Sequence, residues 1–347
     1  MTFRPGLATA LLLLLPLSGC RESAPPSPEP AEIRNASYDA TRQFYAEVNR
    51  AFASRWKAQT GQDVTIGMSH GGSSNQARAI IEGFPADVAT LALGHDIDEI
   101  ARLTGRIPPD WRTRLPANSA PYTSTIVFLV RAGNPKGIRD WADLVRADVE
   151  VISPNPKASG SARWIFLAAW SYGRKEGGSE EHAQDFTARL FSKIPHLAGG
   201  SREATTSFAL RRAGDVLLTW ENEALLAREE FGPDAFEVVV PSISILAEPA
   251  VAVVEANARR HGTETVARAY LHFLYSREGQ EIAARHHYRP RMTMVAKQYG
   301  GRFPALDLAT VDGDFGGWEA AHRRFFADGA LFDRITQGDG GRNRPGQ

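Results

Sequence analysis

The sequence predicts an α/β protein, since from Ile33 onward short apolar runs, turns rich in Gly, Ser, Asn or Pro, and segments of helical period follow one another. The apolar runs are continuous rather than alternating, which is typical of strands buried on both faces of a largely parallel sheet. A chain of 347 residues with 43% hydrophobic content is long enough for two globular units. We therefore expect two units in which helices pack on such sheets.

Residues 1–20 have the pattern of an export signal, with Arg4 ahead of an apolar run from Leu11 to Leu15 and small residues before Cys20. The run is too short to cross a membrane as a mature helix. It closes on a pattern that resembles a bacterial lipobox, in which Cys20 is the lipidated first residue of the mature protein. An ordinary cleaved signal with an incidental cysteine is the alternative. Residues 21–32 are rich in Pro and Ser and are expected to form an extended tether.

The clearest helical pattern runs from Ala40 to Thr60, where apolar residues recur every four positions before Gly61. Strands are expected at Ile126 to Val130, Val149 to Ile152, Val216 to Leu218, Val238 to Val240 and Ala250 to Val254. Further helices are expected at Asn75 to Glu82, Ala162 to Tyr172, Glu180 to Phe191, Thr205 to Arg212, Asn222 to Glu229 and Thr265 to His286. Residues 337–347 contain Gly and Arg and are expected to form a disordered tail.

Four junctions between a strand and a helix combine small residues with a helix start. They are Asn35 to Asp39, Ser69 to Ser74, Lys157 to Ser161 and Gly199 to Ser201. A helix start leaves backbone N–H groups without partners at the positive end of the helix dipole, which suits an anion. In an open α/β sheet such turns lie at the carboxyl ends of the strands, where ligands bind. Convergence on one oxyanion is therefore one hypothesis, and ordinary N-capping is the other.

The charge balance and the motifs argue against several classes of function. Basic and acidic residues number 40 each, so no net field draws the protein onto nucleic acid or an anionic membrane. A serine hydrolase is one alternative, but the nucleophile-elbow pattern at Ser73 requires Gly at the position of Asn75. Metal binding by His70, His286 or His287 lacks the spacing of paired metal ligands. We predict no catalytic residue, no metal and no cofactor.

Several long and unusual stretches occur together over nearly the whole mature chain. They are Asn35 to Thr41 (NASYDAT), Ser69 to Ser74 (SHGGSS), Leu91 to Leu93 (LAL), Ser119 to Gly133, Pro154 to Trp170, Trp220 to Leu226 (WENEALL), Ser242 to Pro249, Tyr288 to Arg291 (YRPR) and Asp314 to Trp318 (DFGGW). In this combination the chain resembles the periplasmic sulfate-binding proteins that serve ABC-type sulfate and thiosulfate importers.

The resemblance implies a bilobed periplasmic-binding-protein fold of type II, with two mixed or parallel sheets flanked by helices and joined by a hinge. One lobe is expected from residues 33–124 plus 247–336, and the other from 125–246. The chain is expected to cross between them near Thr123 to Thr125 and near Ile245 to Glu248. Closure of the hinge around an anion would then produce a shape that a transporter recognises.

The resemblance also implies which groups hold the anion, without any counter-charge in contact. The implied donors are the backbone N–H groups of Asp39, Ser73, Gly160, Ser161 and Ser201, the hydroxyl of Ser159 and the indole N–H of Trp220. Two positions depart from the family pattern, because Ser161 stands where a second glycine is usual and Ser201 where alanine is common. Both positions act through the backbone, so the departures bear on affinity and selectivity rather than on the presence of the site.

Some of these residues have simpler interpretations. A tryptophan beside an apolar strand, such as Trp220, is usually a core residue, although this one directly ends the run from Val216. The flanking Arg163, Arg202 and Glu223 could orient the turns that carry the N–H donors, but charges on solvated helix faces are the more common case, so these residues are left outside the contact set.

A pocket made only of donors suits sulfate, which carries no proton at neutral pH. A protonated phosphate would bury an O–H against donors, at a cost of roughly 1–3 kcal/mol. The carboxylate of Asp39 is therefore expected to cap its own helix and to turn away from the ligand. The predicted function is delivery of sulfate to the permease and ATPase of an ABC importer by a monomeric, extracytoplasmic protein. Thiosulfate and molybdate, which are similar dianions, are the alternative ligands.

Overall fold

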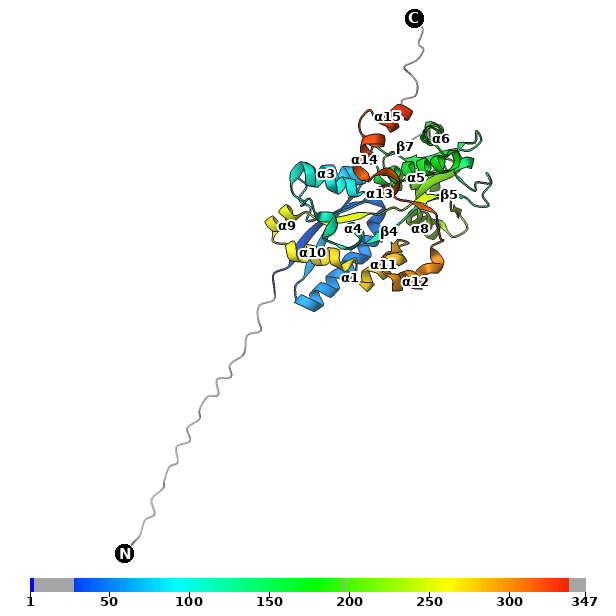
Figure 1. Ribbon diagram of the computed structural model, residues 1–347. Helices are drawn as coiled ribbons and strands as arrows, with labels where there is room; N and C mark the ends of the chain where they lie inside the picture. The colour runs from blue at the N-terminus through cyan, green and yellow to red at the C-terminus, as the bar shows by residue number, and fades with distance from the viewer. Residues whose placement is uncertain (3–27, 196, 337–347) are drawn as a thin grey trace.

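The computed structural model describes residues 1–2, 28–195 and 197–336 (Figure 1). The predicted signal, the lipidation site Cys20, most of the tether and the tail 337–347 lie outside the described residues. Within the described ranges, no helix has both the length and the apolar character that crossing a membrane requires.

The first sheet contains four strands in the order β11-β3-β1-β2. The strands are β1 (Ala31–Tyr38), β2 (Val64–Gly71), β3 (Val88–Leu91) and β11 (Ala250–Val253). β1 is parallel to β2 and β3, whereas β11 is antiparallel to β3. Ile33 and Val88 face α1 (Arg42–Thr60) and α10 (Glu264–Phe273), while Ala36 and Ala89 face α2 (Ser73–Ile81) and α3 (Gly94–Thr104). Both faces of the sheet are therefore covered.

The second sheet contains five strands in the order β7-β6-β8-β5-β9. The strands are β5 (Ile126–Arg131), β6 (Val151–Pro154), β7 (Leu197–Ala198), β8 (Val216–Trp220) and β9 (Phe236–Val239). β6 is parallel to β7 and β8, but β5 is antiparallel to β8 and β9. Helices α5 (Gly160–Gly177) and α6 (Glu180–Ser192) cover one face, and α7 (Ser201–Ala209) and α8 (Glu221–Phe231) the other.

The predicted α/β class with mixed sheets flanked by helices is confirmed, but the parallel direction predicted from the apolar runs is wrong for β5 and β11. Their residues read as continuous apolar runs because helices cover both faces of each sheet. That coverage gives the same sequence pattern whatever the direction of a strand.

The two sheets are joined where two of the chain's crossings lie together, and the chain passes once more to the side of the second sheet before Leu308. Ser124 and Ala247 form an antiparallel bridge, with N–H to carbonyl distances of 2.9 and 3.0 Å. The Thr125 hydroxyl lies 2.8 Å from the Ser244 hydroxyl and donates to the Ile245 carbonyl. The two predicted crossing segments therefore run side by side. Short pairs extend this region, β4 (Tyr122–Thr123) with β12 (Arg289–Pro290) and β10 (Ser244–Ile245) with β13 (Leu308–Ala309).

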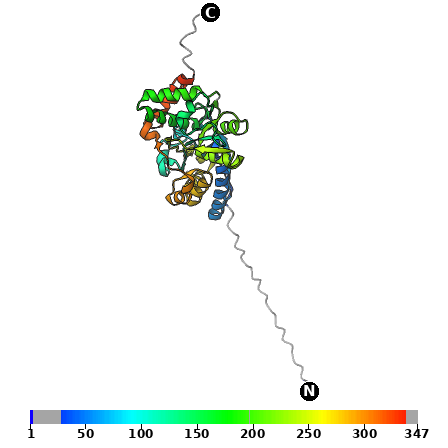
Figure 2. The same ribbon diagram turned by 90° about the vertical axis from the view of Figure 1, so that its right-hand side faces the viewer.

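The C-terminal helices pack on the second sheet's helices, as both ribbon views show (Figures 1 and 2). They are α13 (Val311–Phe315), α14 (Trp318–Ala321), the π-helix η5 (His322–Phe326) and α15 (Leu331–Thr336). The ring centroids of Trp318 and Trp164 lie 4.7 Å apart in an edge-to-face contact, and those of Phe325 and Phe166 lie 5.4 Å apart. Residues from Leu308 onward were predicted to belong to the first lobe, yet these contacts place them against α5 and α6. The exact boundaries of the lobes stay a prediction.

The remaining elements are short. They are α4 (Pro116–Ser119), α9 (Glu255–His261), α11 (Arg277–Arg285), α12 (Thr293–Tyr299) and the 3-10 turns η1 (Asp39–Thr41), η2 (Trp111–Thr113), η3 (Trp141–Val145) and η4 (Gly300–Arg302). The single helix predicted from Thr265 to His286 is wrong, because the structure divides it into α10 and α11. Ser276 starts the second helix, where its side chain accepts a hydrogen bond from the Gly279 N–H at 3.2 Å.

Candidate anion-binding site

Each of the four predicted junctions lies at the carboxyl end of a parallel strand. β1 leads into Asp39, β2 into Ser73, β6 into Gly160 and β7 into Ser201. Each of these residues is the first of a helix or helical turn, so its N–H has no carbonyl partner within that helix. The first two junctions belong to the first sheet and the last two to the second.

The junctions of the two sheets meet in pairs at close range. A Cβ atom placed on Gly160, at the start of α5, would lie 2.8 Å from the Cβ of Ala92 and 3.1 Å from that of Ser73. A Cβ on Gly72 would lie 2.6 Å from the Ala158 carbonyl oxygen. The starts of α2 and α5 are therefore in direct contact, at a separation that only glycine permits.

The carboxylate of Asp39 makes the second contact between the sheets. It accepts hydrogen bonds from the N–H groups of Ala40 at 3.1 Å and of Arg202 at 3.2 Å. Burial raises the pKa of this carboxyl, while the N–H groups of Arg202, Ala40 and Ser201 act to lower it. Its side chain thus bonds within η1, as expected from the sequence. The expectation that it turns away from the ligand donors is wrong, because it also reaches the start of α7, where Ser201 is one of the predicted donors.

The Ser73 hydroxyl is engaged in hydrogen bonds within the protein, so the backbone N–H is the group of Ser73 that can donate to a ligand. The hydroxyl donates to the Asp96 carboxylate at 2.6 Å and accepts from the Ala92 N–H at 3.0 Å. Asp96 also accepts from the Ser74 hydroxyl at 3.1 Å and lies 4.0 Å from the guanidinium of Arg163. Asp96 and Arg163 are both buried, so the expectation of a solvated Arg163 is wrong.

Asp96 is a residue that the sequence interpretation missed. It stands in the first turn of α3, directly after the apolar run of β3. That is the same strand-to-helix signal that identified the other four junctions. Ion pairing with Arg163 joins α3 to α5, the helix whose start carries three of the predicted donors.

The start of α5 places Ser159, Gly160 and Ser161 together. Ser159 is the N-cap, its hydroxyl does not bond to the helix start, and Ser159 and Ser161 are each 2% exposed. Ser161 is not among the described residues with a positive φ angle, so its conformation does not call for the glycine that is usual in the family. The Trp164 indole N–H, one turn further on, donates to the Ala92 carbonyl at 3.0 Å.

Buried polar atoms without partners gather around the starts of α7 and α8. Within the described part of the chain, no hydrogen-bond partner is present for the Trp220 indole N–H, the Ser201 and Thr205 hydroxyls or one carboxyl oxygen of Glu223. Trp220 is fully buried, and its ring lies 5.7 Å from that of Tyr38. A buried donor without an acceptor costs roughly 1–3 kcal/mol, which a bound acceptor would relieve.

The flanking charges divide into one exposed and one buried residue. The side chain of Arg202 is 47% exposed and pairs with Glu230 at 2.9 Å. Glu223 is only 2% exposed, so the expectation that it lies on a solvated face is wrong. Burial raises the pKa of the Glu223 carboxyl to about 8, and the charge of Asp39 adds to that increase.

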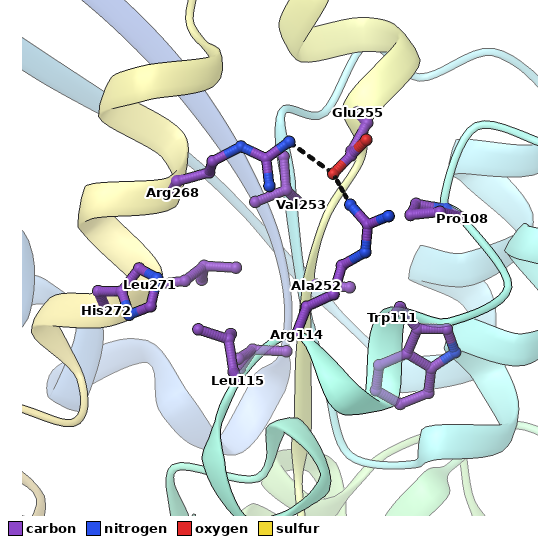
Figure 3. Close-up of a pocket in the computed structure, with 11 residues that line it drawn as sticks. Pro108, Trp111, Arg114, Leu115, Ala252, Val253, Glu255, Arg268, Leu271 and His272 are labelled. Carbon is purple, nitrogen blue, oxygen red and sulfur yellow. Dashed lines mark hydrogen bonds and ion pairs between the residues drawn. The ribbon is translucent and has the colours of Figure 1, made fainter.

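A separate cavity lies between η2, α9, α10 and β11 (Figure 3). The guanidinium groups of Arg114 and Arg268 both point to the carboxylate of Glu255, which pairs with each of them. Leu115 and Leu271 form part of its apolar lining. The arginines of this cavity are thus already matched with an acid, and none of the seven predicted contact residues lines it.

The three histidines weighed as metal ligands have other neighbours. The His286 ring lies 2.7 Å from the Glu47 carboxylate, and that of His287 lies 3.1 Å from Glu229. His70 contacts the Tyr38 carbonyl at 3.4 Å. Among the described residues, no group of three or more His, Cys, Asp or Glu side chains is arranged to hold a metal ion.

Comparisons with known proteins agree with this architecture. Residues 33–289 match the family model of the bacterial extracellular solute-binding proteins. The chain is 54% identical over 307 residues to the sulfate-binding protein of Escherichia coli K12, covering 88% of this chain and 93% of the relative. It is 48% identical over 328 residues to the thiosulfate-binding protein of Pseudomonas aeruginosa, covering 94% of this chain and 97% of that protein.

Solved structures share the fold. The sulfate-binding protein SubI from Mycobacterium tuberculosis H37Rv superposes with a TM-score of 0.77 at 33% identity, over 85% of this chain and 99% of that one. The periplasmic binding protein AfuA from Actinobacillus pleuropneumoniae matches with a TM-score of 0.59 at 17% identity, over 88% of this chain and 97% of that one, a likeness of fold alone. The chain therefore belongs to the bacterial extracellular solute-binding proteins, and its relatives include curated sulfate- and thiosulfate-binding proteins.

Proposed function

We propose that this protein binds sulfate outside the cytoplasm and delivers it to an ABC importer. The observation that carries the proposal is that helix starts from both sheets meet in two pairs, with the buried indole of Trp220, which has no partner among the described residues, packed beside Tyr38. Identity of 54% to a protein named for sulfate binding supports the choice of ligand. We assign the contacts to the N–H groups of Asp39, Ser73, Gly160, Ser161 and Ser201, the hydroxyl of Ser159 and the indole of Trp220.

Selectivity for sulfate over phosphate follows from the kind of groups present. The five backbone N–H groups and the indole N–H donate only and cannot accept the proton of a phosphate. The Asp39 carboxylate is occupied by the N–H groups of Ala40 and Arg202, and the Ser73 hydroxyl is engaged by Asp96. A phosphate O–H directed at these N–H groups has no acceptor, at a cost of roughly 1–3 kcal/mol. The engagement of Ser73 also supports binding rather than nucleophilic catalysis.

The donor set is large enough for useful affinity. Seven hydrogen bonds to a charged ligand, each worth about 1.5 kcal/mol, total about 10 kcal/mol before ordering costs. Ordering costs of about 2 kcal/mol would leave about 8 kcal/mol, which corresponds to micromolar binding.

Capture would proceed by closure between the two sheets, with lobes of residues 33–124 plus 247–336 and 125–246, except that residues from Leu308 onward pack with the second lobe. The anion would draw Asp39 and Ser73 of the first sheet toward the five donors of the second. Contacts between the two sides support this closed arrangement, namely Trp164 to the Ala92 carbonyl and Arg163 to Asp96. We further propose that the protein acts as a monomer, recognised in the closed form by the importer's permease and ATPase.

Thiosulfate is the second candidate ligand, since a relative named for it is 48% identical. It replaces one sulfate oxygen with a larger sulfur that accepts hydrogen bonds weakly. The buried hydroxyl of Ser201 bears on the choice, because it adds a donor and bulk where the family often has alanine. An anchor on Cys20, as the lipobox pattern predicts, would hold the protein at a membrane surface.

Calorimetric titration of residues 21–347 with sulfate, thiosulfate, molybdate and phosphate at neutral pH tests the proposal. We expect one-to-one binding of sulfate and little or no heat with phosphate. Trp220→Phe removes one donor, preserves the ring shape and should weaken binding at least tenfold. Trp170→Phe is the matched control, because that indole is also buried and unpartnered among the described residues but packs on Phe325. Clear heat with another oxyanion and none with sulfate would overturn the assignment.

A further inference from the structure

Glu223 combines properties that a surface glutamate does not have. It lies in the first turn of α8, three residues after Trp220, and is 2% exposed. One of its carboxyl oxygens has no hydrogen-bond partner among the described residues. The hydroxyls of Ser201 and Thr205, which likewise have no partner in the described part of the chain, lie on α7, the helix packed against α8. The carboxyl group is therefore a buried, unsatisfied part of the region assigned to the anion.

The charged and titratable groups around Glu223 offer it no counter-charge of its own. Asp39 from η1 and Glu230 from α8 raise the pKa of its carboxyl, while Arg202 from α7 lowers it. Both hydrogen bonds of the Arg202 guanidinium go to Glu230, at 2.9 and 3.0 Å, rather than to Glu223. Tyr288, just before β12, is a further neighbour, and the charge of Glu223 raises its pKa. With burial as the main cause, the pKa of Glu223 rises to about 8, so the carboxyl is neutral at pH 7.

An ionised Glu223 is incompatible with a bound dianion. Sulfate would bring two negative charges into a buried region that already holds the Asp39 carboxylate. A third buried group of the same sign raises the electrostatic cost steeply, since no solvent screens it. Protonation removes that repulsion and turns the carboxyl into a possible O–H donor.

We propose that Glu223 is a further determinant of the anion site, which binds sulfate only while this carboxyl is protonated and takes up a proton with the anion when it is not. The inference rests on the proposed sulfate function and extends it to a residue outside the predicted contact set. Sulfate and proton are then captured together at alkaline pH, with no bond broken and no other reactant needed.

The linkage between proton binding at Glu223 and sulfate binding determines how strongly sulfate affinity depends on pH. With a pKa near 8 in the free protein, affinity stays nearly constant up to pH 7 and falls about tenfold by pH 9. Proton uptake is about half a proton per sulfate at pH 8 and approaches one proton at pH 9. The histidines near the site do not contribute in this range, because burial lowers the pKa values of His70 and His287.

The experiment is calorimetric titration with sulfate at pH 7, 8 and 9, in pairs of buffers that differ in ionisation enthalpy, which yields both affinity and proton uptake. Glu223→Gln keeps the shape and a donor but cannot ionise, so we expect constant affinity and no uptake. Glu230→Gln is the matched control, because that carboxylate lies nearby and is already paired with Arg202 and Gln43. It should keep the pH dependence, shifted slightly to lower pH.

The possible outcomes separate the two proposals. Sulfate affinity that is unchanged from pH 7 to 9 without proton uptake overturns the role of Glu223 and leaves sulfate binding intact. The same conclusion follows if Glu223→Gln retains the uptake of the unmodified protein. Failure to bind sulfate at pH 7 overturns the proposed function itself.

Discussion

Replacing Gly160 with alanine tests whether the starts of α2 and α5 close on the ligand. The added methyl group would lie 2.8 Å from the Cβ of Ala92 and 3.1 Å from that of Ser73. Ordinary contact between carbon atoms begins at about 3.5 Å, so the two sides must separate by about 0.7 Å. Gly160 has a helical backbone and not a positive φ, so the substitution acts through this contact rather than through backbone strain.

A separation of that size is enough to break hydrogen bonds. A bond of about 2.9 Å that lengthens by about 0.7 Å exceeds the range of a real hydrogen bond. If the anion stays with the five donors of the second sheet, it loses those of Asp39 and Ser73. At about 1.5 kcal/mol each, the loss is about 3 kcal/mol, or on the order of 100-fold in Kd.

Sulfate titration of Gly160→Ala measures this effect, with thermal unfolding in sulfate-free buffer as a check of the fold. Gly300→Ala is the control, because a Cβ at that position meets no atom within 4 Å. Sulfate affinity within about twofold of the unmodified protein would refute the reasoning, since the donors of both sheets could not then act on one ion.

Three further predictions follow from the buried charges and the N-terminal signal. Asp96→Asn removes the carboxylate that pairs with the buried Arg163, which still donates to the Pro156 carbonyl, and should lower the free energy of unfolding by about 3–5 kcal/mol in urea. Exposed Asp185→Asn should change it by less than about 1 kcal/mol. Glu223 binds a proton in the folded state up to about pH 8 but loses it near 4.5 when unfolded, so stability should fall as pH rises between these values. Glu223→Gln should abolish that part of the slope in thermal scans, and an unchanged slope would contradict the assignment. Cys20→Ser should release the protein from membranes in cell fractionation, and continued membrane association would count against lipidation.

The features that the sequence predicts correctly are those specified by a few adjacent residues. The junctions at Ser159 and Ser201 were found because a helix start after a strand is specified by a few adjacent residues. The strands were found because burial on both faces leaves an uninterrupted apolar run. Their directions were not, since that run is the same for β5, which is antiparallel, and for β6, which is parallel to its neighbours.

The errors concern side chains whose surroundings come from distant parts of the chain. From the sequence, Arg163 is predicted to be an ordinary surface cation of a helix. Its ion pair depends on Asp96 of α3, which is distant in the sequence. Glu223 reads as a first-turn glutamate that favours the helix dipole, and its burial depends on η1 and α7 packing around α8. The separate helices α10 and α11 were missed because the apolar period continues across Ser276, while the cap is a single hydroxyl.

The bridge between Ser124 and Ala247 has a mechanical consequence for the proposed opening. Two independent linkers would let the halves slide and twist as well as tilt. Here the linkers are tied to each other by paired backbone hydrogen bonds and by the Thr125 hydroxyl, so they form a narrow ribbon. A ribbon of this kind bends readily across its thin direction and resists shear within its plane. The two sides would then open and close by essentially one bending motion. Each closure would bring the donors of the two sheets back to the same relative positions.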